Sequence, residues 1–166
     1  IGLDASLASD TLSAVRAEFE RETLIPAIAP LAPRLLAELA QRGLTTVLVS
    51  ATRSPLVDPV AQALGVEHAI TSCFGRDKVQ HVQAWLQSMD SSLTDLHESW
   101  FFSDSHNDLP LLDVVMHPVA VDADARLQQV AIDRAWPMMS LRSEVFQGDH
   151  LLPRAAVLGL KSGQSI

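Results

Sequence analysis

The 166-residue sequence predicts an α/β fold in three layers, with a mostly parallel sheet between helices. Two observations lead to this prediction. Short apolar, β-branched runs alternate along the chain with longer segments of helical period. This order is typical of a parallel sheet with right-handed crossovers and helices on both faces. The run at 45–49 is also apolar on both faces, as expected for a strand inside a parallel sheet.

The N-terminal half is expected to begin with helices and then to alternate. Residues 9–28 place apolar side chains at roughly helical spacing between acids and arginines, which indicates one or two amphipathic helices. The helix at 31–42 has one apolar face and stops at Gly43, because glycine tolerates the left-handed conformation of a helix end. The strand at 45–49 follows it. A helix at 55–64 comes next, opened by a proline in its first turn and closed by a glycine.

The C-terminal half continues the alternation up to residue 142. A polar linker separates the helix at 78–89 from the strand at 99–103, which runs directly into an acidic loop. The tail at 143–166 has no clear period, so loop, short helix and disorder all remain open. The expected strands are 66–70, 99–103, 119–121 and 137–141, and the expected helices are 78–89, 109–115 and 123–134.

Composition and charge exclude several classes of function. The chain is long enough for one main domain. Its net charge of −8, without a cluster of lysines and arginines, argues against a nucleic-acid partner. No run approaches the roughly 18 apolar residues of a membrane span. The only cysteine, Cys73, leaves no internal disulfide, and neither end resembles a signal peptide, so we expect a cytoplasmic protein.

The most informative segment is the acidic loop that follows the strand at 99–103. Asp104, Asn107 and Asp108 lie close together there, and hard oxygen ligands of this kind suit Mg²⁺. Ligands bind beyond the carboxyl ends of parallel strands, which is where this loop falls. The two acids could instead cap the short helix that starts near Leu109, but two acids and an amide exceed what a cap needs. The loop therefore predicts a Mg²⁺ site in a phosphate-handling protein.

Two further residues fit phosphate chemistry. Ser50 ends a buried strand and can donate its hydroxyl hydrogen to a phosphoryl oxygen, although a serine there can also cap a helix. Lys78 at a helix start can neutralise charge that builds on the phosphoryl group in the transition state. A lone lysine is more often a solvated surface residue. Asn107 would orient phosphate or water.

Three segments together resemble a known family. Residues 47–52 (VLVSAT), 77–79 (DKV) and 102–112 (FSDSHNDLPLL) are similar to the second, third and fourth motifs of the haloacid dehalogenase (HAD) superfamily. The nearest branch is subfamily IB, which is phosphoserine-phosphatase-like, and the resemblance covers about residues 10–142. It implies a Rossmann-like, HAD-like core at 31–142, the end of a helical cap at 1–30, and a C-terminal tail at 143–166.

The resemblance also implies an activity and a set of roles. It implies Mg²⁺-dependent hydrolysis of a small phosphorylated substrate, such as phosphoserine or histidinol phosphate, through an aspartyl-phosphate. Catalytic roles fall on Ser50 and Lys78, and metal binding falls on Asp104 and Asp108. The phosphate-binding residues implied are Ser50, Ala51, Lys78 and Asn107.

The sequence departs from the family in two places. The nucleophilic Asp-x-Asp-x-Thr motif is not present, and neither Asp4 nor Asp10 has a second acid two residues later after an apolar strand. The chain also passes from Thr71 to Cys73 without the Gly-rich hairpin that relatives carry. In this fold the missing first strand lies between the strand that ends at Ser50 and the one that ends at Asp104, which leaves two apolar edges unpaired. We therefore expect a longer protein that contains both segments.

Two alternative functions share these motifs. A catalytically inactive homologue would bind a phosphorylated ligand or a partner protein, and a phosphotransferase would pass the phosphoryl group to an acceptor other than water. A full-length sequence with or without the nucleophilic motif separates the first alternative from the enzyme. Product analysis separates the second.

Overall fold

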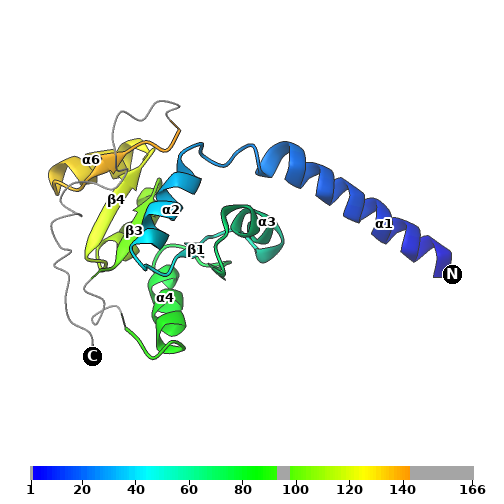
Figure 1. Ribbon diagram of the computed structural model, residues 1–166, viewed down its shortest axis with the longest axis horizontal. Helices are drawn as coiled ribbons and strands as arrows, with labels where there is room; N and C mark the ends of the chain where they lie inside the picture. Colours follow the sequence, from blue (N-terminus) through cyan, green and yellow to red (C-terminus); the bar gives the residue numbers. More distant parts are fainter. Residues whose placement is uncertain (1, 93–97, 143–166) are drawn as a thin grey trace.

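The computed structural model describes residues 2–92 and 98–142, and its strands form two parallel sheets (Figure 1). The smaller sheet pairs β1 (Val47–Val49) with β2 (His68–Ile70). The larger sheet has the order β3-β4-β5, formed by Trp100–Ser103, His117–Val121 and Met138–Met139. The helices are α1 (Gly2–Phe19), η1 (Glu20–Leu24), α2 (Ala32–Gln41), α3 (Ser54–Leu64), α4 (Asp77–Gln87), η2 (His106–Asp108), α5 (Leu109–Leu112) and α6 (Ala125–Asp133).

Helices cover both faces of the larger sheet, which confirms the predicted three layers. Side chains of successive strand residues point to opposite faces. On one face, Val119 and Val121 of β4 pack with Leu35 and Leu39 of α2. On the other face, Ala120 packs in a cluster formed by α5 and α6. Val119, Ala120 and Val121 are all buried, so the C-terminal part of β4 lies at the centre of the core.

Helix α4 joins the two sheets. Val82 and Leu86 of α4 form a buried cluster with Leu111 of α5, and this cluster contacts both sheets. Val49 of β1 and Phe101 of β3 both pack against it. The smaller sheet is therefore held to the larger one through side chains on α4 and α5, because β1 and β3 share no ladder hydrogen bonds.

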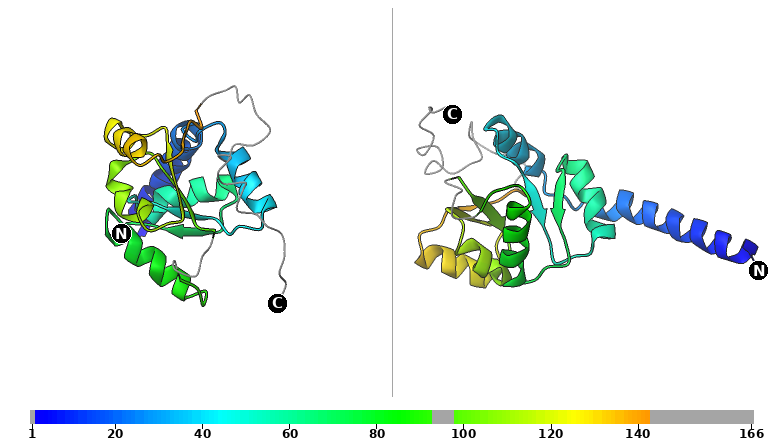
Figure 2. Two further views of the ribbon diagram at one scale, coloured as in Figure 1. Left: turned by 90° about the vertical axis from the view of Figure 1, so that its left-hand side faces the viewer. Right: turned by 90° about the horizontal axis from the view of Figure 1, so that it is seen from below.

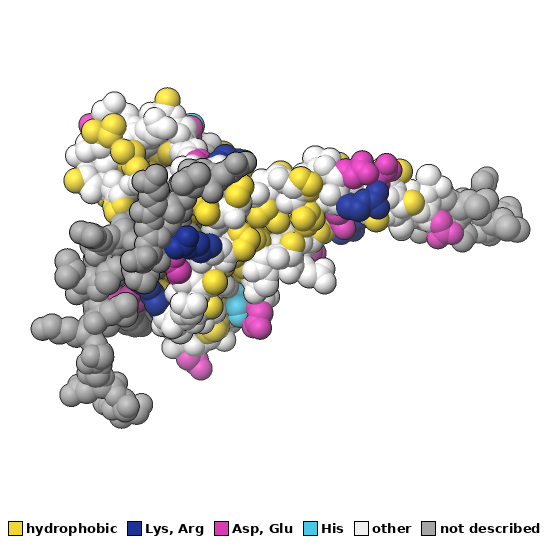
Figure 3. Space-filling view, turned by 45° about the horizontal axis from the view of Figure 1, so that its top comes forward, with side chains coloured by type: hydrophobic (Ala, Val, Ile, Leu, Met, Phe, Trp, Pro, Cys, Tyr) yellow, Lys and Arg dark blue, Asp and Glu magenta, His cyan; other side chains and the backbone are white. Residues whose placement is uncertain are grey.

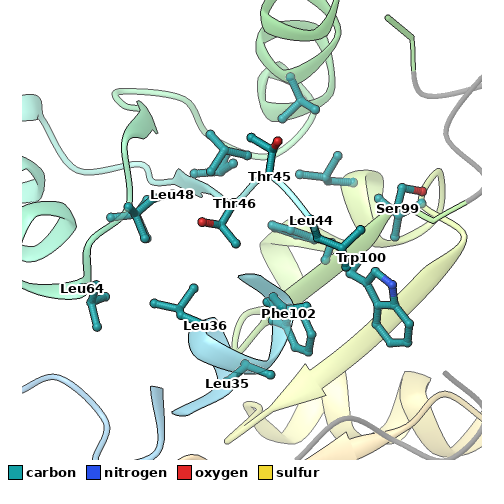
Figure 4. A pocket seen from close by; sticks show the side chains of 18 of the residues that line it. Leu35, Leu36, Leu44, Thr45, Thr46, Leu48, Leu64, Ser99, Trp100 and Phe102 are labelled. Atoms are coloured by element: carbon teal, nitrogen blue, oxygen red, sulfur yellow. The ribbon is translucent and has the colours of Figure 1, made fainter. Parts of the chain in front are cut away.

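An apolar cavity of about 340 Å³ occupies the space between β1 and β3 (Figure 4). We call it the interstrand cavity. Residues of β1, β3 and α2 line it, among them Leu48, Phe102 and Leu36. It lies between the strand that ends at Ser50 and the one that ends at Asp104, where the sequence leads us to expect a further strand, and that strand stays a prediction. Two strand edges with an apolar lining remain unpaired here.

Helix α1 projects away from the rest of the molecule (Figures 1 and 2). The prediction of one or two helices at 9–28 corresponds to α1 followed by η1, a single π-helical turn. Apolar side chains of α1 lie in solvent, since Leu12 is 72% exposed and Val15 is 56% exposed. Figure 3 shows hydrophobic, acidic and basic side chains next to each other along this projection. That residues 1–30 end a helical cap stays a prediction.

The other helices and strands predicted from the sequence are present in the structure, but they begin or end at different residues. The helix expected at 109–115 begins earlier, as η2, and ends at Leu112. The chain turns directly from β2 towards α4, where Ser72 N–H donates to Thr52 O at 3.0 Å and Cys73 N–H donates to Ser50 O at 3.3 Å. The tail at 143–166 lies outside the described residues. Within the ranges that are described, no helix is long and apolar enough to cross a membrane.

Candidate active site

The carboxyl ends of β1 and β3 open into a cavity of about 400 Å³ that is lined by both polar and apolar side chains. We call it the strand-end cavity. It lies where parallel α/β sheets place their ligands. Its lining includes every site residue predicted from the sequence: Ser50, Ala51, Lys78, Asp104, Asn107 and Asp108. Three segments that are far apart in the sequence therefore contribute to one cavity.

Ser50 is fixed by the strand that precedes it. Its N–H donates to Ile70 O of β2 at 2.8 Å, which extends the β1–β2 ladder by one residue. Its Oγ accepts a hydrogen bond from Thr52 N–H at 3.1 Å. A hydroxyl that accepts in this way keeps its own hydrogen for another acceptor. The Ser50 hydroxyl can therefore donate this hydrogen into the cavity. The next residue, Ala51, is exposed and also lines the cavity.

Lys78 and Asp108 form a buried ion pair. Lys78 lies in the first turn of α4 and is 6% exposed, and Asp108 ends η2 and is 7% exposed. Lys78 Nζ lies 2.7 Å from Asp108 Oδ1 and 2.8 Å from Oδ2. Ser103 Oγ donates a further hydrogen bond to Oδ2 at 2.8 Å. The buried carboxylate is therefore paired and hydrogen-bonded, as buried charges need to be.

The two predicted metal ligands stand in different surroundings. Both oxygens of Asp108 are engaged by Lys78 and Ser103. The side chain of Asp104 is exposed, and it has no hydrogen-bond or ion-pair partner among the residues that the structure describes. Over the same ranges, no three His, Cys, Asp or Glu side chains gather into a metal site. Mg²⁺ needs only one or two carboxylates, with water and phosphate in the other positions, so Asp104 suits it as one ligand.

The acidic loop is also held by Asp124, a residue that the sequence analysis did not single out. Asp124 Oδ2 accepts from His106 N–H at 2.8 Å and lies 2.9 Å from His106 Nδ1. Its Oδ1 caps α6 by accepting from Arg126 N–H and Leu127 N–H. The hydrogen bonds from His106 and Leu127 hold the pKa of Asp124 well below its usual range. An acid before an apolar helix is a recognisable N-cap signal, but its contact with the loop spans 18 residues.

Cys73 lies behind Ser50. Its side chain is fully buried, and its Sγ donates to Ser50 O at 3.5 Å. Burial raises the pKa of this thiol, so the thiol stays protonated at neutral pH. Cys73 therefore acts as a packing residue beneath the cavity rather than as a nucleophile in it.

The fold and the cavity together define an α/β protein with a cavity at the carboxyl ends of parallel strands. The chain belongs to the haloacid dehalogenase-like hydrolase family, whose sequence profile matches residues 2–113. This match covers more than half of the chain and confirms the resemblance seen in the three motifs.

Several curated relatives are named phosphatases, and two are described here. A histidinol-phosphatase of Neisseria meningitidis serogroup C is 30% identical in an alignment of 156 positions, which covers 83% of this chain and 70% of the relative. A probable phosphatase of Mycobacterium tuberculosis is 30% identical in an alignment of 166 positions, which covers 87% of this chain and 57% of the relative. Among solved structures, a Bordetella pertussis protein of unknown function is 33% identical, with a TM-score of 0.74 over 79% of this chain and 66% of that one.

The relatives are longer than the matched part. The chain spans 57% to 70% of the two curated phosphatases. The alignment with the Neisseria protein has 156 positions but covers only 83% of a 166-residue chain. Some of its positions are therefore gaps in this chain, and the relative contains inserted residues.

Proposed function

We propose that this chain is the core of a Mg²⁺-dependent phosphomonoester hydrolase that works through an aspartyl-phosphate. One observation supports this more than any other. Six residues predicted from three separate sequence segments line the same strand-end cavity. The names of the two curated relatives point in the same direction.

Each of the six predicted residues has a role in the proposed reaction. Ser50 donates its hydroxyl hydrogen to a phosphoryl oxygen, and Ala51 and Asn107 complete the phosphate-binding surface. Lys78 neutralises charge that builds on the phosphoryl oxygens in the transition state. Asp108 fixes the position of the Lys78 ammonium through the buried ion pair. The charge of Lys78 is thus set in place before the substrate arrives.

We assign Mg²⁺ binding to Asp104, with Asp108 contributing through water. The exposed carboxylate of Asp104 supports the first assignment, and the engagement of both Asp108 oxygens supports the second. Bound Mg²⁺ would draw charge away from the phosphoryl oxygens. Asp104 also faces a cavity in which a substrate phosphate can complete the coordination.

The nucleophile has to come from a strand that is not part of these 166 residues. The interstrand cavity supports this step, because it lies between the two strands whose ends carry Ser50 and Asp104. An aspartate at the end of an added strand would attack phosphorus while the ester P–O bond breaks. A second aspartate two residues later would give a proton to the leaving oxygen, and water would then hydrolyse the aspartyl-phosphate.

The proposed substrate is a small phosphorylated metabolite of the histidinol phosphate or phosphoserine type. The name of the Neisseria relative favours the first. A cytoplasmic location is proposed with it, since the only cysteine forms no internal disulfide.

The test measures phosphate release from a panel of phosphomonoesters by the protein that includes the nucleophilic strand. We expect release to require Mg²⁺ and to fall at least roughly a hundredfold in Asp104→Asn, as for other losses of a transition-state charge partner. The matched control is Asp58→Asn, an exposed acid on α3 whose carboxylate accepts a hydrogen bond from Ser54 of the same helix. Release that survives Asp104→Asn, or that needs no Mg²⁺, contradicts the mechanism.

A second candidate is an inactive homologue that binds a phosphorylated ligand or a partner protein. The sequence itself favours this candidate, since Asp-x-Asp-x-Thr is not among its 166 residues. A full-length sequence without that motif, together with phosphate binding and no turnover, would select it over the enzyme.

A further inference from the structure

The loop that carries Asp104 is connected to Asp124, a residue of a distant segment. Asp124 forms hydrogen bonds through three separate groups. Its N–H donates to Asp104 O at 2.8 Å, and its Oδ2 accepts from both the backbone and the ring of His106. Its Oδ1 holds the first turn of α6 through Arg126 and Leu127. One aspartate therefore joins the acidic loop to the start of α6.

The orientation of His106 follows from these bonds. Ser105, Asn107 and Asp104 line the strand-end cavity, whereas the ring of His106 is bound to Asp124. The loop is thus tied at residue 104 through its carbonyl oxygen and at residue 106 through its N–H. Two ties placed so close together leave the intervening backbone little freedom, and the Asp104 side chain starts between them.

We propose that Asp124 is the positioning residue of the cation-binding loop, holding the backbone at 104–106 so that the Asp104 carboxylate faces the strand-end cavity. The inference rests on the proposed function for the identity of the cation. The hydrogen bonds to a carboxylate are the strong kind, because the acceptor is charged. A neutral cap at residue 124 could hold α6 equally well, but it could not also hold His106.

The substitution Asp124→Ser separates these two tasks. Serine is as good an N-cap as aspartate, so the bonds to α6 are retained. Its single oxygen leaves no second acceptor for His106. Asp124→Ala removes the cap as well and serves as the comparison for lost helix stability. His106→Ala removes only the ring contact and leaves the backbone bond.

The first measurement is amide hydrogen exchange on this chain, with and without each substitution. In Asp124→Ser we expect the His106 and Asp108 amides to exchange roughly ten- to a hundredfold faster, the size of one lost charge-assisted hydrogen bond. The Gln128 amide, which donates to Asp124 O within α6, should keep its rate. His106→Ala should give a smaller change confined to the same loop. Unchanged loop exchange in Asp124→Ser overturns the proposal, and so does an equal increase throughout the sheet.

The second measurement is the Mg²⁺ concentration that gives half-maximal phosphate release in the protein containing the nucleophilic strand. We expect it to rise about tenfold in Asp124→Ser, with kcat at saturating Mg²⁺ changed less, since the loop is disordered rather than removed. An unchanged Mg²⁺ requirement beside faster loop exchange overturns the link to the cation. A wild-type protein without any Mg²⁺ requirement contradicts the proposed function instead, and the exchange result shows separately whether Asp124 holds the loop.

Discussion

At the scale of single residues, the Lys78–Asp108 pair is the most consequential contact in the core. Both residues are under 10% exposed, and each charge is the main partner that compensates the other for the loss of water. Replacing Lys78 with Met leaves a buried carboxylate with Ser103 as its remaining partner. We expect this substitution to lower the free energy of unfolding by about 3–5 kcal/mol, as for other buried pairs broken on one side. Urea denaturation measures it.

The double variant Lys78→Met/Asp108→Leu is the control for that prediction. It removes both charges, so we expect it to recover most of the lost stability. The exposed pair Arg134–Asp113 provides a second comparison, since Arg134→Met there should cost less than about 1 kcal/mol. A double variant as unstable as the single one would show that packing of the lysine stem, rather than charge pairing, accounts for the loss.

At the scale of elements, we expect the smaller sheet to be the least stable part of the described core. It consists of two strands of three residues each, and such a pair is marginal unless other elements pack against it. The edge of β1 towards β3 has no strand partner, whereas β4 pairs on both sides. The smaller sheet otherwise packs against α3 and against the buried cluster of α4 and α5.

This difference predicts unequal hydrogen exchange within one molecule. The Ser50 amide, bonded to Ile70 O, should exchange at least roughly tenfold faster than the Ala120 amide, bonded to Pro137 O, because local opening of a two-stranded unit breaks fewer contacts. Exchange measured by NMR on the native chain gives both rates. Equal rates for the two amides would mean that the sheets open together as one cooperative unit.

The same elements show how far the sequence could predict this structure. Strands that end in Ser50 and Asp104 were identifiable because apolar runs stop at polar residues. Gly65 marked the end of α3, and it adopts a φ of 67° there. The contact between Lys78 and Asp108 was not predictable, because it joins residues 30 apart and depends on how α4 packs. The contact of Asp124 with His106 is unpredictable for the same reason, because it joins residues 18 apart, whereas the cap that Asp124 forms on α6 is local.

At the scale of the whole molecule, the interstrand cavity separates the two sheets and leaves the facing edges of β1 and β3 without a strand partner. Strand edges that lie beside an apolar cavity can accept an extended segment through main-chain hydrogen bonds. Cys73 reports on the smaller sheet beside this cavity, because its residue is fully buried, its Sγ donates to Ser50 O, and burial raises the pKa of its thiol. Thiol reagents should therefore label it only when the smaller sheet opens.

We expect an added strand to slow that labelling. A peptide with roughly five β-branched apolar residues, enough to pair with β3 at about 3.3 Å per residue, followed by Asp-x-Asp-x-Thr, should enter the cavity and pair with both edges. Labelling of Cys73 at pH 8 should then slow by at least about tenfold, since filling the cavity stabilises the closed state by mass action. The matched control carries proline at its third position, which removes a ladder hydrogen bond that a central strand requires. Equal protection by both peptides, or none by either, would show that the cavity does not bind a strand, and the nucleophile would then have to reach Ser50 and Asp104 by another route.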